Sequence, residues 1–281
     1  MSQFELLLCT DLDRTLLPNG TQPESLQARQ LFRNFASHPA ISLVFVSGRH
    51  RGLIEKAINN YRLPRPDFVI SEVGTNIYDL REAGWQVWSQ WQDEIAADWK
   101  GYRQRQLSEI LRDVSQLRLQ ELSKQNTFKL SYYILPHVDR AALHRTLTER
   151  FAELGIEASL VWSVDEPAGV GLLDVLPRRA TNLHAIEFLQ GYLGVVPSAT
   201  LFAGDSGNDL PVLASSIPSV LVANAAPAVA RDALAAALES SNRQQLYIAQ
   251  GGFLDMNGNY SAGILEGVAH YHPELVPLFT V

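Results

Sequence analysis

The chain has 281 residues, 46% of them hydrophobic and 19% charged, which is the composition of a folded globular protein and not of a disordered one. Its formal net charge of -7 argues against nucleic-acid binding, which relies on basic surfaces, and no apolar stretch reaches the roughly 20 residues that cross a bilayer. With one cysteine, Cys9, and no recognisable signal peptide, we expect a cytoplasmic monomer that has no internal disulfide.

The first predicted element is a short apolar strand, residues 6–9, that ends in two aspartates, Asp11 and Asp13. The run lacks alternation, which is typical of a strand buried on both faces of a parallel sheet, and such sheets bind ligands beyond the carboxyl ends of their strands. Two carboxylates this close repel each other unless a cation neutralises them or one carries a proton. With Mg²⁺ the pair would suit phosphoryl transfer, one carboxylate attacking phosphorus and the other moving a proton. The alternative is a pair of turn-forming aspartates.

The next segment alternates between helix and strand. Apolar spacing predicts a helix over 23–35, a buried strand at 41–46, a helix from about residue 53 and a strand at 68–70. This order is the signature of an α/β core with a Rossmann-like parallel sheet and right-handed crossovers. Gly74 and Thr75 then either border a pocket at the strand end or form a plain turn into a hairpin.

The strand at 41–46 ends in three residues suited to phosphate binding, Ser47, Gly48 and Arg49. A hydroxyl group and a glycine amide at the start of a helix would hold phosphate oxygens there.

From about residue 85 the pattern changes to alternating strands between helices. We predict a helix over 107–117, a strand at 128–134, a helix over 140–154, and strands at 156–164 and 170–176. This indicates an antiparallel sheet covered by helices. We therefore predict that residues 85–171 form an inserted α+β cap domain and that residues 1–84 and 172–281 form the core. Closure of such a lid would exclude water from the site.

Two groups of cap residues have alternative interpretations. Four tryptophans lie between Trp85 and Trp99, where they would either stack on a sugar ring or, as is commoner for large aromatics, fill a core. Lys129, Ser131 and Tyr133 share one face of a strand, which would look either toward the catalytic loops or toward solvent.

The second half of the core carries another acidic motif. A strand at 200–203 ends in GDSGND, which places Asp205, Asn208 and Asp209 within five positions. The glycines allow a tight turn, and the carboxylates add hard metal ligands. Around it we predict a helix after Pro177 capped by Thr181 or Asn182, a helix through 210–213, a strand at 220–223, a helix over 225–238 and a last packed helix over 260–271.

These three strand-end motifs, in this order, resemble those of the haloacid dehalogenase superfamily of phosphohydrolases. The likeness lies in D-x-D-x-T from Asp11 to Thr15, in Ser47, and in the acidic loop from Gly204 to Asp209. It implies that Asp11 is the nucleophile, Asp13 the general acid and base, and Ser47 a phosphate ligand. The implied Mg²⁺ ligands are Asp11, Asp13, Asp205 and Asp209, and the substrate contacts of the core are Gly48, Arg49 and Asn208.

Within that superfamily the chain resembles the sucrose-6-phosphate phosphatases over nearly its full length, through segments such as TDLDRTLL, FKLSYYIL, LLDVLP, VANAAP and SAGILEGVAHY. The resemblance implies Mg²⁺-dependent hydrolysis of sucrose 6-phosphate to sucrose and phosphate. One position departs from the family pattern, because Asn182 stands where a lysine is expected. Arg178, Arg179 or Lys129 would have to supply its charge, although arginine and lysine differ in geometry.

Two alternatives follow from these observations. In the first, the substrate is not sucrose 6-phosphate but the phosphate of glucosylglycerate, trehalose or a hexose. In the other alternative, which the missing lysine motivates, the chain is a non-catalytic sugar-phosphate-binding partner of a sugar-phosphate synthase.

Overall fold

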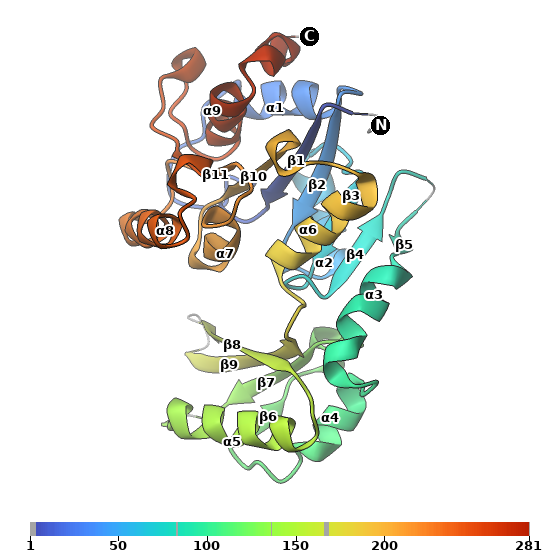
Figure 1. The fold of residues 1–281 in the computed structure, drawn as a ribbon. Coiled ribbons are helices and arrows are strands. Elements are labelled where there is room, and N and C mark those ends of the chain that lie inside the picture. The colour runs from blue at the N-terminus through green and yellow to red at the C-terminus, as the bar shows by residue number, and fades with distance from the viewer. Residues whose placement is uncertain (1–3, 83, 136, 166–168, 281) are drawn as a thin grey trace. The chain divides into compact units, whose positions relative to one another are not determined.

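The computed structural model describes residues 4–82, 84–135, 137–165 and 169–280. Its contacts divide the chain into two units, one made of residues 1–87 and 182–281 and the other of residues 88–181 (Figure 1). The sequence-based boundaries lie at 84/85 and 171/172, and the assignment of separate domains stays a prediction.

The first unit is built on an eight-stranded sheet in the order β12-β11-β10-β1-β2-β3-β4-β5. The strands from β12 to β3 run parallel, whereas β4 and β5 are antiparallel, so the predicted α/β core with a parallel sheet is confirmed. The turn at Gly74 and Thr75 joins the hairpin strands β3 and β4, as the plain-turn alternative expects. The strands are β1 (Leu6–Asp11), β2 (Ile41–Val46), β3 (Phe68–Ser71), β4 (Asn76–Asp79), β5 (Gln86–Val87), β10 (Thr200–Gly204), β11 (Ser219–Leu221) and β12 (Leu246–Ile248).

Helices cover this sheet and explain why its central strands are continuously apolar. Side chains of α1, α2 and α9 form one core with alternate residues of the strands, while α6 contacts β3 and α7 contacts β10 and β11. Helix α9 approaches β11 so closely that a Cβ atom on Gly267 would lie 2.6 Å from Val220 Cβ. The helices of this unit are α1 (Ala28–Ala36), α2 (Arg51–Tyr61), α6 (Asn182–Leu193), α7 (Leu210–Leu213), α8 (Pro227–Glu239) and α9 (Ser261–Tyr271).

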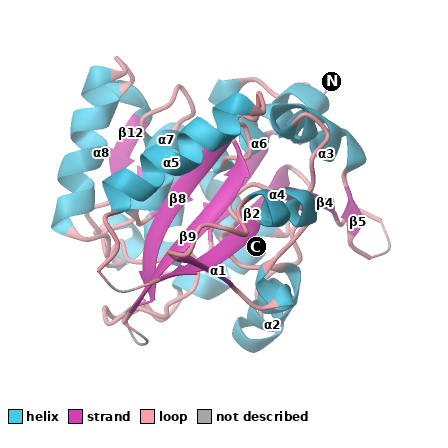
Figure 2. Ribbon diagram, turned by 90° about the horizontal axis from the view of Figure 1, so that it is seen from below, coloured by secondary structure: helices cyan, strands magenta, loops and turns pink. Residues whose placement is uncertain are grey.

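The described residues of the second unit form an antiparallel sheet in the order β6-β7-β9-β8 together with helices, which confirms the predicted α+β character (Figure 2). Leu143, Leu147 and Phe151 form the buried face of α5. The elements are α3 (Ser89–Ala96), α4 (Gln104–Ile110), β6 (Leu117–Leu119), β7 (Leu130–Ile134), α5 (Arg140–Glu153), β8 (Ala158–Asp165) and β9 (Val170–Pro177).

For this segment one prediction is wrong, and one pair of alternatives is decided. The helix predicted to reach residue 117 ends at Ile110. Leu111 and Val114 are buried although they lie beyond the helix, so the apolar spacing continues past its end. The sugar-stacking alternative fails for Trp91 and Trp99, both of which have no exposed surface and fill the core.

Within the described part of the chain, no helix combines the length and the apolar character that crossing a bilayer requires.

Candidate active site

The parallel register of the central sheet brings the three strand-end motifs to one edge. Asp11 is the last residue of β1 and pairs with Val46 of β2, so Ser47 follows at the same level. On the other side of β1, Thr10 pairs with Ala203 of β10, and the GDSGND loop therefore starts beside Asp11. The carboxyl ends of β1, β2 and β10 form the edge at which open α/β sheets bind ligands.

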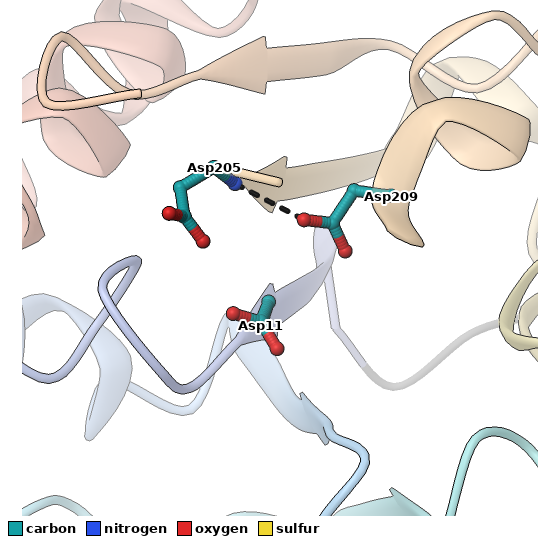
Figure 3. A group of neighbouring side chains, drawn as sticks. All are labelled: Asp11, Asp205 and Asp209. Carbon is teal, nitrogen blue, oxygen red and sulfur yellow. Dashed lines mark hydrogen bonds between the residues drawn. The ribbon is translucent and has the colours of Figure 1, made fainter. Parts of the chain in front are cut away.

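Three carboxylates converge at this edge, those of Asp11, Asp205 and Asp209 (Figure 3). One oxygen atom from each lies within 4.8 Å of the others. Asp205 and Asp209 are buried, with 4% and 2% of their surface exposed, and Asp11 is partly buried. We call these three residues the acidic trio.

The short loop after β10 fixes the orientation of the Asp209 carboxylate through three hydrogen bonds. Its Oδ2 accepts hydrogen bonds from the main-chain N–H groups of Asp205 and Ser206, at 3.1 and 2.9 Å, and from the Ser206 hydroxyl at 3.0 Å. Gly204 is required at the end of the strand, because a Cβ atom there would lie 2.7 Å from Asp209 Cγ. The glycine thus allows the carboxylate to fold back over the strand end.

Burial raises the pKa of each member of the trio, and neighbouring negative charge adds to this at Asp11 and Asp205. Burial raises the pKa of Asp11 well above its ordinary value, and the charges of Asp209 and Asp205 raise it further. Burial and Asp209 raise the pKa of Asp205 to about 6, although Arg14 and Thr15 act in the opposite direction. Burial also raises the pKa of Asp209. A hard divalent cation would relieve this repulsion, so the oxygen donors of the trio fit Mg²⁺.

Asp13 lies outside the acidic trio, in a different set of contacts. Arg49 donates to both of its oxygens, from Nε to Oδ2 at 2.7 Å and from Nη2 to Oδ1 at 2.5 Å, and Asn19 Nδ2 donates to Oδ1 at 2.7 Å. The hydrogen bond to Asp13 raises the pKa of Arg49. The structure thus joins two residues that were assigned to different roles, and a direct metal contact of Asp13 stays a prediction.

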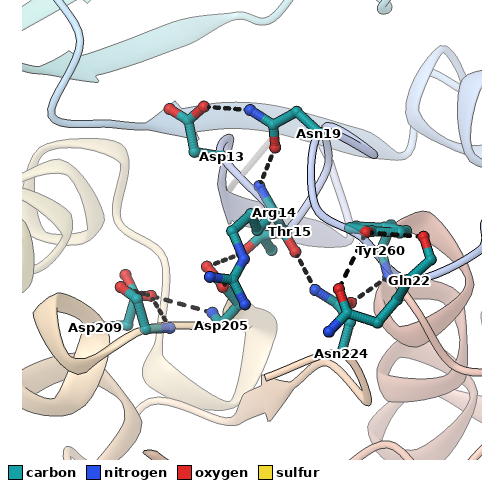
Figure 4. A network of polar contacts seen from close by, with 10 residues as sticks. Asp13, Arg14, Thr15, Asn19, Gln22, Asp205, Asp209, Asn224 and Tyr260 are labelled. Carbon is teal, nitrogen blue, oxygen red and sulfur yellow. Dashed lines mark hydrogen bonds and ion pairs between the residues drawn. The ribbon is translucent and has the colours of Figure 1, made fainter. Parts of the chain in front are cut away.

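Asp205 is braced by the two residues that follow Asp13. Thr15 Oγ1 donates to Asp205 Oδ1 at 3.3 Å, and Arg14 Nε lies 3.4 Å from Asp205 Oδ2 (Figure 4). Among the described residues, Arg14 is the cation that forms an ion pair with a member of the trio, and 46% of its side chain is exposed.

The other phosphate-binding candidates of the core lie around the same strand ends. Ser47 is buried, and its Oγ accepts a hydrogen bond from the Arg49 main-chain N–H at 3.2 Å. Gly48 and Asn208 are exposed, directly after β2 and in the turn after β10. Their roles as phosphate contacts stay predictions.

The candidates for the missing lysine charge are paired within the second unit. Lys129 Nζ lies 3.5 Å from Asp174 Oδ2, Arg178 Nη1 lies 2.9 Å from Glu157 Oε2, and Arg179 binds Asp98 and Glu94. Asn182 begins α6 in the first unit, and its Oδ1 is buried without a hydrogen-bond partner among the described residues. None of these contacts tests the predicted role of these residues toward substrate.

Sequence reasoning missed the parts played by Arg14, Asn19 and Asn224. Asn19 belongs to none of the motifs, yet it contacts Asp13 and the main chain of Arg14. Asn224, which lies 210 residues later in the chain, donates to the carbonyl oxygen of Arg14. The available signal was position, because Asn224 follows strand β11 as Asp205 follows β10.

Comparison with known proteins places this geometry in context. The family model described as sucrose-6F-phosphate phosphohydrolase matches residues 4–272. A putative haloacid-dehalogenase-like hydrolase of Nitrosococcus oceani is 52% identical over 96% of this chain and 72% of that protein. Mannosylfructose-phosphate phosphatase of Agrobacterium fabrum is 26% identical over 94% of this chain and 96% of that protein. Sucrose-phosphatase of Synechocystis, solved in complex with sucrose and phosphate, has a TM-score of 0.72 and 27% identity, covering 95% of this chain and 98% of that chain.

Proposed function

Because this chain belongs to the sucrose-6F-phosphate phosphohydrolase family, whose members are phosphoric monoester hydrolases, we propose that it hydrolyses a sugar phosphate with the help of Mg²⁺. Sucrose 6-phosphate is the substrate we favour, and the product would be sucrose with inorganic phosphate. The observation that carries the proposal is the convergence of Asp11, Asp205 and Asp209 at the carboxyl ends of two adjacent strands.

In this proposal Asp11 is the nucleophile. Its carboxylate oxygen forms a bond to phosphorus while the bond between phosphorus and the sugar oxygen breaks, and the product is an aspartyl-phosphate. Asp13 gives a proton to the departing sugar oxygen. It then takes a proton from the water that attacks the aspartyl-phosphate, and this second step releases phosphate and regenerates Asp11.

The acidic trio would hold Mg²⁺, which when bound supplies positive charge to the trio and to the phosphate oxygens. Without such a cation, burial and the charges of Asp209 and Asp205 keep the pKa of Asp11 high and favour its protonated form. A protonated carboxyl group is a poor nucleophile. Neutralisation of the trio therefore prepares Asp11 for attack.

Arg49 links phosphate binding to the availability of Asp13. Its guanidinium group donates to both oxygens of Asp13, so these oxygens are occupied before substrate binds. A phosphate group is an equally good partner for a guanidinium group. We infer that substrate phosphate draws Arg49 away from Asp13, which leaves the Asp13 oxygens free to face the departing sugar oxygen.

The choice of sucrose 6-phosphate rests on the family and on the Synechocystis relative, which was solved with sucrose and phosphate. The Agrobacterium relative acts on mannosylfructose phosphate, so that disaccharide phosphate is the leading alternative. Released phosphate should be assayed with Mg²⁺ and with EDTA on sucrose 6-phosphate, mannosylfructose phosphate, trehalose 6-phosphate, glucosylglycerate phosphate and hexose phosphates. A preference for another sugar would correct the substrate, and no turnover of any ester would reject the function.

A further inference from the structure

Arg14, which separates Asp13 from Thr15, has a left-handed backbone with φ of 62°, a conformation that is uncommon outside glycine. Its main-chain N–H donates to Asn19 Oδ1 at 2.8 Å, and its carbonyl oxygen accepts from Asn224 Nδ2 at 2.6 Å. Two asparagine side chains therefore satisfy both polar groups of this residue and oppose its return to an ordinary conformation.

The second polar atom of each amide extends these contacts in opposite directions (Figure 4). Asn19 Nδ2 donates to Asp13 Oδ1 at 2.7 Å, whereas Asn224 Oδ1 accepts from the main-chain N–H of Tyr260 at 2.8 Å. Asn224 and Tyr260 are 3% and 0% exposed, and the Tyr260 hydroxyl donates to the Gln22 carbonyl oxygen at 3.1 Å. The loop after β1 is thus tied to the residue that precedes α9.

The residues held by these amides are those that meet the acidic site. Thr15 Oγ1 and Arg14 Nε contact the two oxygens of Asp205, and Asp13 is the residue directly before Arg14. If the backbone of Arg14 relaxed to negative φ, the peptides on both sides of it would rotate. Asp13 and Thr15 would then leave their present positions together.

We propose that Asn19 and Asn224 are positioning residues, which hold Arg14 in its left-handed conformation and so set Asp13 and the brace on Asp205 for reaction. This inference rests on the proposed function of the same site. It also assigns a role to the C-terminal segment, since Tyr260 orients Asn224 from the start of α9.

Replacement of Asn224 by aspartate separates this role from simple packing, because the two side chains have the same size. Asn224 Nδ2 now donates to the Arg14 carbonyl oxygen at 2.6 Å. In the variant a carboxylate oxygen takes the place of Nδ2, and two oxygen atoms that both accept hydrogen bonds would repel each other. Asn242 offers a matched control, since its Nδ2 donates to the Ala214 carbonyl oxygen at 3.0 Å in a different part of the same unit. Asn19, which is exposed, supplies a second variant that leaves the core intact.

The experiment compares the wild type with Asn224→Asp, Asn19→Ala and Asn242→Asp. It measures kcat and KM on p-nitrophenyl phosphate and on sucrose 6-phosphate, and Mg²⁺ affinity by isothermal titration calorimetry. We expect Asn224→Asp and Asn19→Ala to lower kcat by about 10- to 100-fold and to weaken Mg²⁺ binding by about tenfold, with KM within about twofold. Asn242→Asp should change none of these values.

The outcomes distinguish the two proposals. Wild-type kcat and Mg²⁺ affinity in Asn19→Ala and in folded Asn224→Asp would overturn the positioning role, and Asn19→Ala decides alone if Asn224→Asp does not fold. If the wild type binds Mg²⁺ but hydrolyses no ester, the proposed function fails while calorimetry still tests the positioning role. A wild type with neither property rejects both.

Discussion

Replacement of Asp205 by asparagine should stabilise the metal-free protein at neutral pH. The pKa of Asp205 is raised from 3.8 to about 6 in the folded state. Two pKa units correspond to about 3 kcal/mol, which we reduce to about 2 kcal/mol for solvent screening. For a protein of this size that gain raises Tm by about 4–8 °C in EDTA at pH 7.

The sign of this effect changes with pH and with metal. Between pH 3.8 and about 6 the folded protein binds more protons at Asp205 than the unfolded chain, so stability falls as pH rises through this window. The difference between variant and wild type should therefore vanish below about pH 4 and be complete above about pH 6. Mg²⁺ at 100 times its Kd should stabilise the wild type by about 2.7 kcal/mol, and the variant less, because it lacks one ligand.

The assay is thermal unfolding followed by circular dichroism at pH 4, 5.5 and 7, with EDTA or Mg²⁺. Asp232→Asn, an exposed aspartate on α8, is the control and should leave Tm unchanged in every condition. A lower Tm for Asp205→Asn in EDTA at pH 7 would refute the reasoning, because it would mean that the contacts of Asp205 outweigh the repulsion within the trio.

Three further predictions concern the reaction. Asp11→Asn should lower kcat at least about 1000-fold, because the amide is no nucleophile, while circular dichroism shows an unchanged fold; retained turnover would reject Asp11 as nucleophile. Gly204→Ala should lower kcat by about 10- to 100-fold, because its Cβ atom, 2.7 Å from Asp209 Cγ, displaces that carboxylate; equal kcat would show that Asp209 needs no such exact placement. Asn182→Lys should raise kcat/KM about tenfold, since Arg178 and Arg179 are paired with acidic residues of their own unit; an unchanged value would mean that the charge is already supplied.

The sequence was sufficient to predict the sheet and the meeting of its acidic motifs. The apolar runs of β1 and β2 indicated strands buried on both faces, and parallel strands must present their carboxyl ends at one edge. That rule places Asp11 and Asp205 at the same edge, and the pairing of β1 with β10 makes them neighbours. Short elements such as β5 and β12 escaped prediction, because two or three residues carry too little periodic pattern.

Side-chain partners were much less predictable. Arg49 has no local signal that selects Asp13, which lies 36 residues earlier. Asn224 reaches a main-chain carbonyl of Arg14 across 210 residues, and a main-chain acceptor carries no sequence identity that a motif could reveal. The same limit applies to Trp91 and Trp99, whose composition suits either a sugar platform or a core until their burial is known.

Strand β1 has neighbours from opposite ends of the chain, β2 at residues 41–46 and β10 at residues 200–204. During synthesis β1 therefore keeps one edge unpaired until residues 200–204 have been made, and open strand edges of this kind invite aggregation. A nascent chain that stalls before residue 200 carries Asp11 without either of its acidic companions. Translation products that end before residue 200 should thus be prone to aggregation and without phosphatase activity.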